Sequence, residues 1–63
     1  MGRAGAELSS ISTALEELTR RVTAIADGYA GAKQDDLATE LYAAERALVG
    51  AHRRLQRVGE ADR

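Results

Sequence analysis

The stretch GYAGAKQDD, residues 28–36, separates two heptad runs that do not share one phase. Before it, apolar residues step alternately by three and four positions: Leu8, Ile11, Leu15, Leu18, Val22, Ile25 and Tyr29. After it, a second run follows the same rule: Leu37, Leu41, Ala44, Leu48, Ala51, Leu55 and Val58. Runs of this kind are typical of helices that pack as a coiled coil.

The change of phase distinguishes a hairpin from one long helix. Continuing the first run would place Asp36 at a core position, whereas the second run restarts at Leu37. Gly28 and Gly31 favour helix termination at this point. Asp35 and Asp36 are good N-cap residues for a new helix. The sequence therefore favours an antiparallel hairpin over a continuous helix.

We expect an all-α fold, an antiparallel two-helix hairpin (a coiled coil) that dimerises into a four-helix bundle. The whole chain, residues 1–63, is predicted to be one domain. The first helix is expected at about 5–29, a turn at about 30–35 and the second helix at about 36–58.

The two runs also predict how the helices pair. Joining residues whose numbers add to 66 matches Tyr29 with Leu37 and Leu8 with Val58, and it combines an a position with a d position in each layer. A sum near 63 is the alternative, and it matches a with a. In the preferred pairing, every residue of both runs lies in the seam between the helices.

A hairpin of this size is expected to associate. It covers each core side chain from one side only, and the chain has no Cys that could form a disulfide. The second helix carries small residues, Ala43, Ala47 and Gly50, with Tyr42 and Val49 on its other flank. We predict that these five residues form an interface with a second copy or with a partner's helix.

Composition limits the other classes of function. The chain has 9 basic and 10 acidic residues and a formal charge of −1, which argues against general affinity for nucleic acid. No apolar stretch is long enough to cross a membrane, and the N-terminus has no apolar signal core. The sequence predicts a soluble cytoplasmic protein without a cofactor.

Four arginines, with one histidine among them, make the second half of the second helix locally basic: Arg46, Arg53, Arg54 and Arg57. Cations near a helix C-terminus complement its dipole, so a solvated face is the ordinary interpretation. The alternative is a binding site for an anion, a nucleotide or RNA, because arginine recognises phosphate. His52 has no ligand partner at metal-binding spacing, so we expect it to be a boundary residue and predict no metal site.

Residues 40–55, ELYAAERALVGAHRRL, resemble uncharacterised small actinobacterial helical proteins, as does a composition with eight Arg and one Lys. In length and layout, the chain is similar to the Rop class of RNA-binding four-helix bundles. No functional residue of that class matches a position here, so the likeness implies an architecture and no RNA binding.

No catalytic arrangement is predicted either. The chain has no glycine-rich phosphate loop, and its sequence supports no Ser/His/Asp arrangement. Two helices offer no enclosed pocket. The sequence therefore predicts a non-enzymatic interaction or regulatory module that acts as a homodimer.

Overall fold

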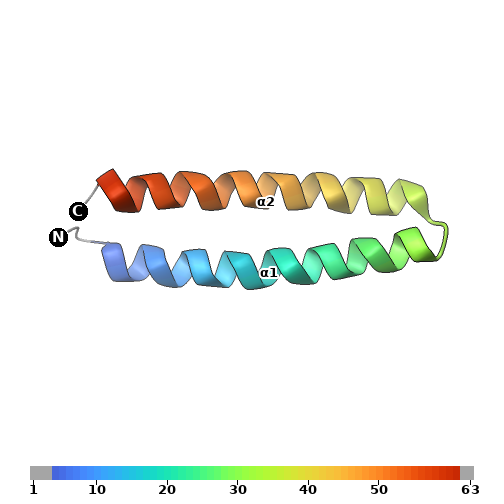
Figure 1. The fold of residues 1–63 in the computed structure, drawn as a ribbon, viewed down its shortest axis with the longest axis horizontal. Coiled ribbons are helices and arrows are strands. Elements are labelled where there is room, and N and C mark those ends of the chain that lie inside the picture. The colour runs from blue at the N-terminus through green and yellow to red at the C-terminus, as the bar shows by residue number, and fades with distance from the viewer. Residues whose placement is uncertain (1–3, 62–63) are drawn as a thin grey trace.

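The chain is a helical hairpin, as the two heptad runs predict. A computed structural model describes residues 4–61, which form α1 (Gly5–Gly31) and α2 (Asp35–Ala61), joined by residues 32–34. The helices lie side by side and antiparallel, with the loop at one end and both ends of the described chain at the other (Figure 1). The molecule is a rod with extents of 48 × 14 × 9 Å.

The loop is a Schellman motif built around a lysine. Lys33 has a φ of 62°, in the left-handed region. Its N–H donates to the Ala30 carbonyl at 3.1 Å, and the Gln34 N–H donates to the Tyr29 carbonyl at 2.9 Å. These two bonds satisfy carbonyl groups that the end of α1 would otherwise leave without partners.

Both helices extend further toward the loop than the pattern of glycines and aspartates suggests. Gly28 lies inside α1 and Gly31 is its last residue, so neither glycine takes the left-handed position. The α2 helix begins at Asp35, and the Gln34 carbonyl accepts a bond from the first turn. Asp35 and Asp36 therefore lie in the first turn of α2, where the helix dipole stabilises their charge, and not at the N-cap.

Replacing Lys33 with glycine should stabilise the hairpin. A non-glycine residue in the left-handed region carries a steric cost that glycine avoids. We expect the free energy of unfolding to rise by about 0.5–1 kcal/mol in urea denaturation. Ala32→Gly is the control, because Ala32 has a φ of −90° and gains nothing from glycine. Equal stabilisation by both changes would contradict the strain at Lys33.

Two alanines are the most deeply buried residues between the helices. Ala26 is 0% exposed and Ala38 is 3% exposed, and no large side chain within residues 4–61 is fully buried. Half-buried residues extend the seam in both directions: Leu8, Ser12, Leu15, Thr19, Val22 and Tyr29 from α1, with Leu41, Glu45, Leu48, His52 and Leu55 from α2. The seam is therefore narrow and partly polar.

The prediction that both heptad runs lie wholly in the seam is wrong for half of their residues. Ile11, Leu18 and Ile25 are exposed, and the positions that follow them along α1 point toward α2 instead. Those positions hold small or hydroxyl residues, which allow the backbones to come close. Thr19 fits there because its hydroxyl donates to the Leu15 carbonyl at 2.6 Å and so keeps a partner.

The polar contacts between the helices bear on the predicted pairing. They join residues whose numbers add to 68 or 69: Glu16 with His52, Thr23 with Glu45, and Asp27 with Tyr42. Helical side chains tilt toward the N-terminus of their own helix. Each side-chain tip therefore lies at the level of the preceding residue. In antiparallel helices, two residues whose tips touch have numbers that add to about two more than the numbers of two residues whose backbones lie opposite each other. The contacts favour a backbone pairing near 66 over the alternative near 63.

Candidate interaction surface

Large apolar side chains are exposed along one side of the hairpin. Ile11, Leu18 and Ile25 of α1 are 42%, 46% and 55% exposed. Leu37 and Val58 of α2 are 46% and 53% exposed, and the intervening residues of the same heptad row, Ala44 and Ala51, are exposed too. These seven residues are called the open face below.

Helix geometry places both rows on the same side of the molecule. In α1, Leu18 precedes the seam residue Thr19 by one position, and in α2, Leu37 precedes the buried Ala38 in the same way. One residue along an α-helix is a rotation of about 100°. Because the helices are antiparallel, stepping back one residue in each rotates both rows toward the same side of the hairpin. The open face is therefore one continuous surface.

The open face is unusual for a chain of this size. Solitary exposed apolar residues are common, but a contiguous apolar surface marks a site of interaction. The described chain buries only Ala26 and Ala38, so its largest side chains do not form an internal core. The radius of gyration is 14.6 Å, well above the value of about 11 Å expected for a compact 63-residue domain. The hairpin is therefore a single thin layer of two helices.

The opposite side of the seam is mostly polar, although Val49 lies there and is 37% exposed. Three pairs of side chains join the helices there and are called the polar ladder: Asp27–Tyr42, Thr23–Glu45 and Glu16–His52. The Tyr42 hydroxyl donates to Asp27 Oδ1, and the Thr23 hydroxyl contacts the Glu45 carboxylate. The two sides of the hairpin therefore differ sharply in character.

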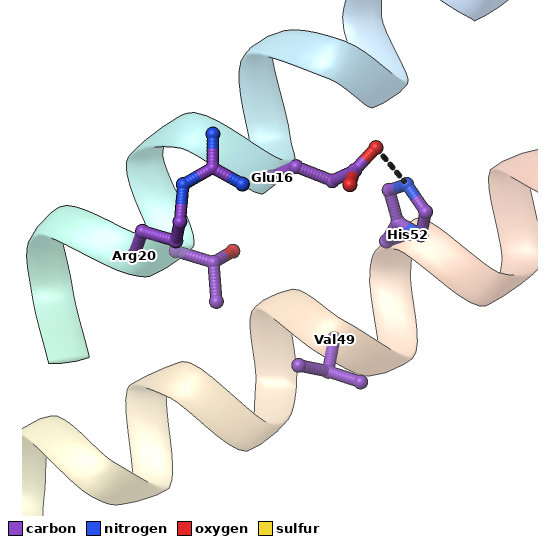
Figure 2. Close-up of a pocket in the computed structure, with 5 residues that line it drawn as sticks. Glu16, Arg20, Val49 and His52 are labelled. Atoms are coloured by element: carbon purple, nitrogen blue, oxygen red, sulfur yellow. Dashed lines mark ion pairs between the residues drawn. The ribbon is translucent and has the colours of Figure 1, made fainter.

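His52 lies at the end of the polar ladder, beside a shallow groove. Its side chain is 18% exposed, and its Nε2 lies 3.5 Å from Glu16 Oε1 without a hydrogen-bond partner. Figure 2 shows these two side chains pointing toward each other across the helices. The groove has a volume of about 290 Å³ and is lined by Glu16, Thr19, Arg20, Val49 and His52. It is wide open to solvent, so it does not enclose a substrate.

The pKa of Tyr42 is raised, first because its hydroxyl donates a hydrogen bond to Asp27, and further by burial and by the charges of Asp27 and Glu45. Each of these favours the neutral phenol in the folded state. A pKa raised on folding contributes stability that is complete below the unfolded value of about 10 and is lost as the pH rises through the folded value.

The free energy of unfolding should therefore fall as the pH rises above about 10. Urea denaturation between pH 8 and pH 11.5 measures this loss. The Tyr42→Phe variant keeps the ring, removes the hydroxyl that donates to Asp27 and should lose less stability over the same range. An identical slope in both proteins would show that the Asp27–Tyr42 bond does not couple folding to this ionisation.

The residues predicted from the sequence as an interface lie elsewhere than the open face. Tyr42 and Val49 lie beside the seam on the side of the polar ladder. Ala43 and Ala47 are exposed and Gly50 is half-buried, all on the part of α2 that is turned away from α1. Their role as an interface stays a prediction. The residues of the open face belong to the two heptad runs, which the sequence pattern predicts to lie in the seam.

The four arginines predicted as an anion site, Arg46, Arg53, Arg54 and Arg57, are all exposed on α2. Ion pairs among residues 4–61 involve Arg20 with Glu17 at 2.8 Å and His52 with Glu16, so these four guanidinium groups have no carboxylate partner there. No group of three or more potential metal ligands occurs within the described chain. Neither α1 nor α2 is long and apolar enough to cross a membrane.

Comparisons with known proteins identified no relative of the chain. A scan against protein-family models, a search of curated proteins and a search of solved structures each gave no match to the chain.

Proposed function

We propose that the chain is a non-enzymatic protein-interaction module whose working surface is the open face. The observation that carries this proposal is the exposure of Ile11, Leu18 and Ile25 on α1, next to Leu37 and Val58 on α2. Covering such a surface releases water from apolar groups, at about 25 cal/mol for each Å² buried. Exposed helices on another protein can match the open face in shape, because apolar residues at heptad spacing pack as knobs into holes.

The rest of the molecule supports a binding role over a catalytic one. The groove beside His52 is open, and the polar ladder uses its carboxylates and hydroxyls in contacts between the helices. A module of this kind acts by occupying another helical surface, which is how a small regulator sequesters its target. Association through an apolar face also depends only weakly on salt, whereas binding to phosphate depends on it steeply.

Cross-linking in an extract of the source organism, followed by mass spectrometry, tests the proposal. The unmodified chain should form cross-linked products, with itself or with another protein. Leu18→Glu, which places a charge in the centre of the open face, should lose them. Ala24→Glu adds the same charge at an exposed position of α1 turned away from α2, and should keep them. Equal products from all three proteins would rule out the open face as the working surface.

Anion binding is the second candidate, favoured by the four exposed arginines that lack carboxylate partners. A polyanion such as RNA would be held by charge, so its affinity should fall steeply between about 50 and 200 mM salt. Filter binding of a labelled RNA at these salt concentrations measures this dependence. Replacing Arg53 and Arg57 with Gln should abolish such binding and leave association through the open face unchanged.

A further inference from the structure

We infer that the occupant of the open face is a second copy of this chain, docked so that the two loops lie at the same end of a four-helix bundle. The inference rests on the proposed function, because it names the partner of the same surface. It has three supports: the surface area of the hairpin, the sizes of the residues on the open face, and the charges at its edges.

The surface area matches what a dimer of this size needs. The hairpin exposes 4847 Å². A compact monomer of 6.7 kDa is expected to expose about 3,900 Å², which is about 900 Å² less. A standard interface between two proteins buries about 800 Å² on each partner. One face-to-face contact between two hairpins is therefore enough to bring the chain to the surface of an ordinary folded protein.

The open face is complementary to itself. The row on α1 is uniformly large, with Ile11, Leu18 and Ile25, whereas the row on α2 is small in its middle, with Ala44 and Ala51. By the pairing sum of 66, Ala44 lies at a level between Leu18 and Ile25, and Ala51 lies at a level between Ile11 and Leu18. If α1 of a second copy lies over α2 at the same level, the large residues flank the small ones, as knobs beside holes.

This complementarity favours one relative orientation of the two hairpins. With both loops at one end, each α1 lies over the α2 of the other copy, so the large row on α1 covers the small middle of the row on α2. With loops at opposite ends, α1 lies over α1, and Leu18 meets its own symmetry mate, while Ala44 meets Ala51 of the second copy. The contact between the two α1 helices would be overpacked, and the contact between the two α2 helices would leave a void. Both faults destabilise a core.

The edges of the open face carry matching charges. Glu7 and Arg21 border the row on α1, and Glu40 and Arg54 border the row on α2. With the loops at one end, Arg21 lies within reach of Glu40 of the second copy, and Glu7 lies within reach of Arg54 of the second copy. Opposite charges also meet when α2 lies over α2, so the charges favour a second copy in either orientation. The side-chain volumes then favour the orientation in which both loops lie at the same end of the bundle.

Two measurements on the purified full chain test the inference. Sedimentation equilibrium should give twice the chain mass of 6.7 kDa. The chain has no Cys, so Ala32→Cys in the exposed loop accepts a single spin label per copy. With the loops together, the distance between labels should be below about 25 Å, since neighbouring helices pack 8–10 Å apart. With the loops at opposite ends, it should be about 40 Å or more, the length of a 27-residue helix.

Each result decides between outcomes. A dimer with the short distance supports the inference. A dimer with the long distance overturns the shared end, and a monomer at millimolar concentration overturns the second copy as the partner. In the last case, cross-linking in the extract separates the two proposals. Products with another protein that Leu18→Glu removes and Ala24→Glu keeps would leave the proposed function standing, and the absence of such products would end both.

Discussion

The Leu18→Glu variant should be monomeric at concentrations where the unmodified chain is a dimer. Leu18 occupies the middle of the α1 row and is 46% exposed in the hairpin. In a face-to-face dimer the change occurs twice, and each glutamate would bury a charge among apolar side chains. We expect the dissociation constant to rise at least on the order of 100-fold, which corresponds to about 2.7 kcal/mol.

Sedimentation equilibrium of the variant measures this effect directly, and thermal unfolding provides a second readout. The melting temperature of a dimer rises with protein concentration, because association stabilises only the folded chain. The unmodified chain should show this rise and Leu18→Glu should not. The Ala24→Glu control carries the same charge at an exposed position on the other side of α1, and it should behave as the unmodified chain does.

The Ala26→Glu variant should lose the hairpin itself. Ala26 is 0% exposed in the seam between the helices, so a glutamate there must either bury an unpaired charge or separate α1 from α2. An uncompensated buried charge costs about 3 kcal/mol or more, which is a large part of the stability of any small domain. Circular dichroism should show a strong loss of helix at 25 °C.

The matched control lies two residues away. Ala24→Glu adds the same side chain to the same helix at an exposed position, so propensity and net charge are equal in the two variants. A folded Ala26→Glu variant as stable as Ala24→Glu would contradict the close packing of the helices at Ala26. Urea denaturation of both proteins would show the difference in the free energy of unfolding.

The hairpin could be predicted from the sequence because two heptad runs with different phases require a change of direction between them. What the runs could not reveal is which neighbour covers which residue. A heptad stripe is wide enough to contact two helices at once, and small residues beside it can take the place nearest the first. Ser12, Thr19 and Ala26 do this, and they leave Leu18 and Ile25 exposed.

The loop shows a second limit. Glycine is the usual residue in the left-handed conformation that ends a helix, so the sequence predicts that the first helix ends near Gly28 and Gly31. Gly28 lies inside α1, where a glycine costs about 1 kcal/mol, and Gly31 is the last residue of the helix. The left-handed position is instead occupied by Lys33, whose side chain has no property that favours this conformation. The Asp27–Tyr42 contact was missed for another reason, because it depends on the observed rotation of the helices.

The polar ladder determines how far an assembly of these hairpins can grow. A hairpin with apolar residues on both sides would stack into a layered fibre, each copy adding one more. Here Asp27–Tyr42 and Glu16–His52 lie on the side away from the open face. In the dimer inferred above, the polar ladder would lie on both outer surfaces, with Val49 as the large apolar side chain exposed beside it. The inferred dimer would therefore offer further copies a mostly hydrated surface, which disfavours growth by stacking beyond two copies.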